Sequence, residues 1–184
     1  MVRGSCWVVG WMRLVAWLLI LAPVHLGAQA RPPAPHEVEA AYLYQFGRYV
    51  EWPADQRWAS DTFDICVLGT DPFGPALDAM VKGQMIAGRP VAARRIRGPN
   101  DAQDCRIVFV GPSEDARVPA ILLALGRTGA VTVSRGTQFT RAGGMIAFVA
   151  EAQKVRFVVN LAAAEAAGLQ LSSQLLRVAV SVEQ

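Results

Sequence analysis

The stretch CRIVFV, from Cys105 to Val110, decides the fold class because it is apolar at almost every position. A strand of this kind is covered on both faces, as in a parallel sheet that lies between two layers of helices. Other strand-like runs occupy Thr62 to Gly69, Arg89 to Ile96 and Ala130 to Ser134. Helical patterns separate several of these runs, so the sequence predicts an α/β domain with a mostly parallel sheet.

Two helices are predicted in the first half of the domain. Apolar residues that recur at steps of three and four predict the first helix. This helix should end before Trp52-Pro53. The second begins at Asp71-Pro72, which offers a cap followed by proline at the first helical position, and runs to about Lys82. The residues that form the apolar face of the first helix are Val38, Tyr42, Phe46, Tyr49 and Val50.

In the second half of the domain, the sequence predicts a helix from Glu114 to Leu125 and then an antiparallel hairpin. The hairpin joins Met145–Ala150 to Val155–Asn160 through a short polar turn. A helix from Leu161 to Ala167 should end at Gly168. A last helix carries Leu171, Leu175, Val178 and Val182 on one face. We therefore expect a single three-layer domain over residues 36–184, with a mostly parallel sheet flanked by helices and an antiparallel edge hairpin.

The first thirty residues have the pattern of a secretory signal peptide. Two arginines precede an apolar run from Leu14 to Leu26, and the small-residue site Ala28-Gln29-Ala30 follows it. We expect cleavage after Ala30, a flexible leader over residues 31–35 and no stable membrane insertion after cleavage. An uncleaved anchor is the alternative, although the run is short for a span of about 20 residues.

Cysteine and charge content narrow the class of protein further. Cleavage would leave Cys66 and Cys105, an even number in an oxidising compartment, so a disulfide is the leading interpretation and two buried free thiols are the alternative.

The chain has 18 basic and 15 acidic residues, and removal of Arg3 and Arg13 leaves 16 basic against 15 acidic residues. A nucleic-acid-binding protein normally carries a larger basic surplus, so nucleic acid is not expected as a partner.

No catalytic constellation or cofactor motif is present in the sequence. It contains no phosphate-binding loop, no dinucleotide-binding glycine pattern and no nucleophile elbow. His36 would be the only histidine after cleavage, so no metal-ligand spacing is present, and a Ser-His or Cys-His pair would have to take its base from the flexible start of the domain. The sequence therefore predicts a binding protein with no catalytic residues, no cofactor and no metal.

Three features are candidates for binding. Arg89, Arg95 and Arg97 share one side of a predicted strand, where they could clamp an anion or a partner, or could instead protect a sheet edge. Arg177 belongs to a polar stripe on the final helix that is either a solvated face or a contact. The turn from Gly69 to Gly74 follows a strand, so it could hold a ligand or could be a capped connection.

Several segments together resemble the YfiR-like family, and they cover nearly the whole mature chain in the right order. These segments are FGRYVEWP at 46–53, ICVLGTDPFG at 65–74, GGMIAFV at 143–149, VRFVVNL at 155–161 and LLR at 175–177. The resemblance implies a periplasmic α/β protein, often dimeric, that holds an inner-membrane diguanylate cyclase inactive by contacting its periplasmic portion. Release of this repression would raise cyclic di-GMP and promote biofilm formation.

The resemblance also bears on the cysteines. Cys66 and Cys105 match the structural cysteine pair of the family, whereas the further cysteines that some relatives carry later in the chain are absent here. The resemblance thus predicts a disulfide and a periplasmic repressor that lowers cyclic di-GMP, with a homodimer as a further expectation. The alternatives are a periplasmic small-ligand receptor or envelope chaperone-like module without a cyclase partner, and an unrecognised hydrolase.

Overall fold

An eight-stranded sheet runs through the molecule in the order β10-β8-β7-β6-β5-β2-β4-β3. The computed structural model describes residues 31–54, 56 and 59–183, so the predicted signal peptide lies outside the described residues. The strands are β1 (Val50–Glu51), β2 (Phe63–Leu68), β3 (Met85–Ile86), β4 (Arg89–Ile96), β5 (Cys105–Val110), β6 (Val131–Arg135), β7 (Ile146–Glu151), β8 (Lys154–Asn160), β9 (Gln170–Leu171) and β10 (Ser181–Glu183). The helices are α1 (Pro35–Tyr49), α2 (Pro75–Val81), α3 (Val118–Leu125), α4 (Thr137–Arg141), α5 (Leu161–Ala166) and α6 (Ser173–Val178), with short 3-10 turns at Pro99–Ala102 and Pro112–Arg117.

Five neighbouring strands, β4, β2, β5, β6 and β7, are parallel. The hairpin of β7 and β8 is antiparallel, as predicted, and turns through Ala152 and Gln153. It lies one strand in from the edge, because β10 adds to the outer side of β8 in parallel. The predicted fold class is confirmed.

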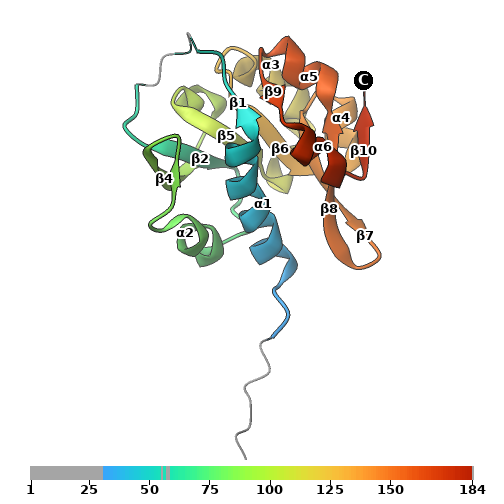
Figure 1. The fold of residues 1–184 in the computed structure, drawn as a ribbon. Coiled ribbons are helices and arrows are strands. Elements are labelled where there is room, and N and C mark those ends of the chain that lie inside the picture. Colours follow the sequence, from blue (N-terminus) through green and yellow to red (C-terminus); the bar gives the residue numbers. More distant parts are fainter. Residues whose placement is uncertain (1–30, 55, 57–58, 184) are drawn as a thin grey trace, which may run out of the picture. The chain divides into compact units, whose positions relative to one another are not determined.

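Helices cover both faces of the sheet (Figure 1). On one face, Leu43 and Phe46 of α1, together with residues of α2, α5 and α6, pack against the larger core cluster. On the other face, α3, α4 and the 3-10 turn at Pro99–Ala102 enclose a second cluster. The strand β5 is buried at all six positions, which is why its sequence is continuously apolar.

The second predicted helix begins later than its sequence suggested. Asp71 accepts hydrogen bonds from the backbone N–H groups of Phe73 and Gly74, at 2.7 and 3.3 Å, and so caps a turn instead of a helix. Gly74 has a φ of +52°, and α2 starts at the next residue, Pro75. The prediction of a helix start at Pro72 was therefore wrong by three positions.

Two other predicted helices differ from the structure at one end. The segment from Glu114 is a 3-10 turn up to Arg117, and the α-helix begins at Val118, because Pro119 has no N–H to donate to an earlier carbonyl. At the C-terminus, α6 ends at Val178, and Val182 lies in β10 instead of on the helix. The open edge of β8 offers backbone partners that this segment uses in place of helical hydrogen bonds.

Candidate functional site

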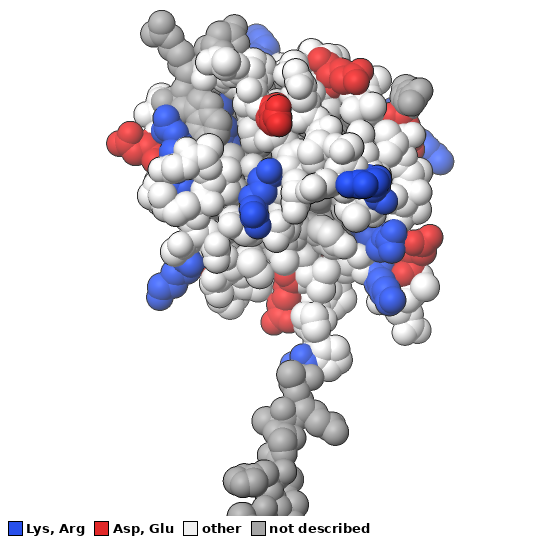
Figure 2. All heavy atoms as spheres, viewed as in Figure 1, with Lys and Arg blue, Asp and Glu red and all other residues white. Residues whose placement is uncertain are grey.

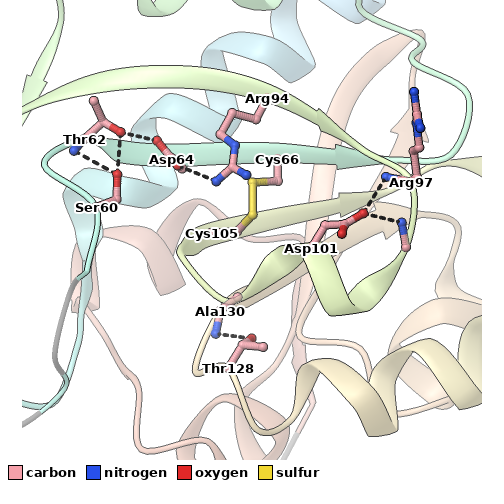
Figure 3. Close-up of a disulfide and its surroundings, with 11 residues drawn as sticks. Ser60, Thr62, Asp64, Cys66, Arg94, Arg97, Asp101, Cys105, Thr128 and Ala130 are labelled. Atoms are coloured by element: carbon pink, nitrogen blue, oxygen red, sulfur yellow. Dashed lines mark hydrogen bonds and ion pairs between the residues drawn. A yellow bond between two sulfur atoms is a disulfide. The ribbon is translucent and has the colours of Figure 1, made fainter.

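Cys66 and Cys105 form a disulfide between the adjacent strands β2 and β5 (Figure 3). Their Cα atoms are 5.9 Å apart, and both residues are fully buried in the second core cluster. The predicted pairing is confirmed. Because neither sulfur is exposed, this bond cross-links the middle of the sheet and does not present a reactive thiol at the surface.

Arg94 and Asp64 form an ion pair on the same face of the sheet as the disulfide. Arg94 is the register partner of Cys66, and its Nη1 lies 2.8 Å from Oδ2 of Asp64. The buried Asp64 carboxylate also accepts a hydrogen bond from the hydroxyl of Thr62. Figure 3 shows this polar group beside the disulfide at the start of β2. The pairing satisfies a carboxylate that would otherwise be buried without compensation.

Arg95 points to the opposite side of β4, where it binds two carboxylates of the protein itself. Its guanidinium donates to Asp71 and to both carboxylate oxygens of Asp78, at 2.7 to 2.9 Å, and to the carbonyl of Gly74. The hydrogen bond from Arg95 holds the pKa of Asp78 below its usual value. The same partners raise the pKa of Arg95. This network ties β4 to the start of α2.

The remaining candidate arginines are spread over the sheet. Arg89 and Arg95 share the side of β4 that was predicted for them, and Arg89 donates to the backbone carbonyl of Ser60. Arg97 follows the end of β4 and is exposed, whereas Arg177 is exposed on α6. Neither Arg97 nor Arg177 forms an ion pair with any residue that the structure describes. Arg97 and Arg177 thus lie apart without an ion pair among the described residues, and the structure does not gather the four arginines into one site.

Figure 2 shows several basic side chains close together along the right side of this face, beside an acidic one, and the other charged side chains scattered over it. Among the described residues, no group of three or more His, Cys, Asp or Glu is placed to hold a metal ion. In that same part of the chain, no helix is both long and apolar enough to span a membrane.

The turn that was a candidate ligand loop lies at the point where the strand order reverses, between β2 and β5. Ligands often bind at this position in open α/β sheets. Here the two loops contact each other directly: the N–H of Gly111 donates to Leu68, and the N–H of Thr70 donates to the hydroxyl of Ser113, at 2.8 and 2.9 Å. A Cβ at Gly111 would lie 2.7 Å from the carbonyl oxygen of Thr70. The loops therefore close the crevice, which favours the interpretation as a capped connection.

Sequence reasoning missed an ion pair at the same edge of the sheet. Nε and Nη2 of Arg135, the last residue of β6, donate to the two carboxylate oxygens of Glu39 on α1, at 3.0 and 2.6 Å. Glu39 is 5% exposed, and the Arg135 guanidinium also lies 6.0 Å from the ring centre of Phe109. The pair spans 96 positions, so no local pattern could have indicated it. Two cavities adjoin Arg135 and Gly136.

Comparison with protein families gives a match to the model described as YfiR/HmsC-like over residues 36–180. A search of curated protein sequences gives no significant match. Among solved structures, a conserved domain protein from Vibrio cholerae is similar, with a TM-score of 0.58 and 12% identity over 82% of this chain. An ABC domain from Streptococcus pneumonia in complex with L-Trp gives a TM-score of 0.51 and 11% identity over 80% of this chain. This chain covers 60% of each of those chains, and at such identities the likeness concerns the fold alone.

Proposed function

Because the chain belongs to the YfiR/HmsC-like family, we propose that it is a periplasmic regulator that binds the periplasmic portion of an inner-membrane diguanylate cyclase and represses it. The family match carries this proposal, since it extends over residues 36–180 and so includes nearly the whole of the described fold. Repression would keep cyclic di-GMP low. The chain acts as a binder in this role and catalyses no reaction.

The described structure is compatible with work in the periplasm. The disulfide of Cys66 and Cys105 is buried in the centre of the sheet and needs an oxidising compartment to form. The exposed arginines Arg97 and Arg177 are available for a contact with a partner, whereas Arg95 is held by Asp71 and Asp78. Of the four arginines that the sequence singled out, Arg97 and Arg177 are therefore the better candidates for a repressor surface.

Deletion of the gene tests the proposal directly. Cyclic di-GMP should rise in the deletion strain under conditions in which a membrane-bound cyclase is expressed, and the exported chain should restore the lower level. A version that lacks residues 1–30 should fail to restore it. Unchanged cyclic di-GMP, together with no crosslink between the exported chain and an inner-membrane protein, would contradict the proposal.

Charge reversal then locates the contact. Arg97→Glu and Arg177→Glu change exposed side chains, so their effects on stability should stay within about 0.5 kcal/mol. If either arginine contacts the cyclase, its reversal should raise cyclic di-GMP at unchanged periplasmic abundance, because such charges affect association more than folding. Arg127→Glu, at another exposed arginine, is the matched control. If neither variant differs from that control, the contact uses neither arginine.

A further inference from the structure

A cavity of about 640 Å³ lies at the carboxyl end of β6, between the β7–β8 hairpin and the start of α1. The cavity arises because β6 ends earlier than its neighbour β7. The last register pair between β6 and β7 joins Arg135 to Phe148, and β7 continues to Glu151 with β8 as its partner. The hairpin therefore projects past the end of β6 as a wall (Figure 1). Pro35 of α1 lines the cavity as well.

Arg135 contributes a charged group with unused hydrogen-bond donors to this cavity. A guanidinium has two edges that can each bind a carboxylate in bidentate fashion. Glu39 occupies the edge made by Nε and Nη2, whereas Nη1 has no hydrogen bond to any described residue. The Arg135 side chain is 37% exposed, so its outer edge is accessible. Glu39 thus holds the guanidinium in place while leaving room for a second carboxylate.

The rest of the lining selects an anion with an apolar body. The exposed surface of the lining is mainly apolar, and Lys154, the register partner of Glu151, adds a positive charge to it. Since Glu39 neutralises Arg135 and Glu151 is not part of the lining, Lys154 supplies the one net positive charge there, which matches a ligand with a single negative charge. The neighbouring cavity on the other side of Arg135 carries Asp115, which would repel an anion there. The aliphatic lining residues are Pro35, Val149, Ala150 and Val155.

We propose that this cavity binds a small aliphatic monocarboxylate, whose carboxylate pairs with the outer edge of Arg135 and whose chain lies along the hairpin wall. The volume is within the range of about 300–1,000 Å³ that ligand pockets usually have. The position is also at the carboxyl ends of parallel strands, where α/β sheets commonly bind ligands. The crevice at the reversal point is closed by Gly111 and Thr70, and this cavity is an open alternative at that edge. The proposal is independent of a cyclase partner.

The proposal can be tested by titrating the full exported chain with sodium hexanoate and measuring binding by calorimetry or by amide NMR shifts. Hexanamide is the matched neutral ligand. Arg135→Lys can retain the pair with Glu39 but loses the second bidentate edge, and it should weaken hexanoate binding about tenfold. Ala150→Glu places a negative charge in the exposed wall and should abolish binding, whereas Leu123→Glu adds the same charge to a distant exposed position on α3. Arg97→Lys is the control for the arginine substitution.

Saturable hexanoate binding that Arg135→Lys and Ala150→Glu weaken and the two controls retain would support the site. Equal binding of hexanoate and hexanamide would overturn it, and so would an affinity for hexanoate that Ala150→Glu leaves unchanged. If Arg135→Lys fails to fold, the comparison of Ala150→Glu with Leu123→Glu decides the question. Absence of binding at millimolar hexanoate would also overturn the proposal.

Discussion

Arg135, at the end of β6, holds the buried carboxylate of Glu39 on α1 through two hydrogen bonds. This pair fixes the first half of α1 to the carboxyl end of β6. A buried carboxylate that loses its partner is costly, because water cannot replace the lost interaction.

We therefore predict that Arg135→Met lowers the free energy of unfolding by about 1–3 kcal/mol, less than for a fully buried pair because the arginine is partly exposed. Glu39→Gln should cost less, since the amide oxygen can still accept a hydrogen bond. Urea unfolding of both single variants and the double variant measures the coupling between them. Strictly additive effects would show that the pair contributes nothing to stability.

The disulfide gives the second prediction. Replacing Cys66 and Cys105 together by alanine should lower stability by about 2–5 kcal/mol, because the bond closes a loop over a sequence separation of 39 residues and so restricts the unfolded chain. Unfolding of the wild type with and without reductant measures the effect, and the double alanine variant should not respond to reductant. Labelling of both cysteines in denatured, unreduced wild-type protein would contradict the bond.

The third prediction concerns pH. The hydrogen bond from Arg95 lowers the pKa of Asp78 in the folded protein, so the ionised carboxylate stabilises the fold above its unfolded pKa near 3.8. This contribution is lost as the pH falls through the folded-state pKa. Asp78→Asn should therefore be less stable than wild type at pH 7, by under about 1 kcal/mol because the pair is exposed, and the difference should shrink below about pH 4. Urea midpoints between pH 7 and pH 3 check this, and a constant difference would contradict it.

The contact between the loops after β2 and β5 gives a fourth prediction. Gly111→Ala should lower stability by about 1–3 kcal/mol, because the added Cβ would lie 2.7 Å from the backbone oxygen of Thr70. Gly98→Ala is the control, since a Cβ there meets no atom within 4 Å and the backbone is extended. Thermal unfolding of the two variants distinguishes them. Equal effects would mean that the crevice can open without cost.

The fifth prediction concerns processing of the N-terminus. The basic start, the apolar run and the Ala-Gln-Ala site indicate cleavage after Ala30, so the chain recovered from the host periplasm should begin at Arg31. Intact-mass measurement of the recovered protein checks this position. A membrane-bound species that retains Met1 would instead support an uncleaved anchor.

The elements that the sequence predicted well are those whose signal is local. The strand from Cys105 to Val110 and the hairpin of β7 and β8 have the predicted type and nearly the predicted bounds, because burial on one or both faces dictates which residue types can occupy them. The cysteine pairing was also predictable, since only two cysteines follow the predicted cleavage site. Composition and the quoted segments were sufficient to indicate the family that the match confirms.

The tertiary structure alone decided which charged residues are used. Arg95 and Arg97 lie on the same predicted side of one strand, but the turn before α2 places Asp71 beside Arg95 and α2 places Asp78 there, whereas Arg97 forms no ion pair with a described residue. Val182 belongs to a strand because β8 has an open edge beside it, which no local pattern reveals. Glu39 meets Arg135 only when α1 packs on the sheet. Amino-acid order determines patterns of burial over a few residues, whereas ion pairs and cavities depend on which distant segments fold against each other.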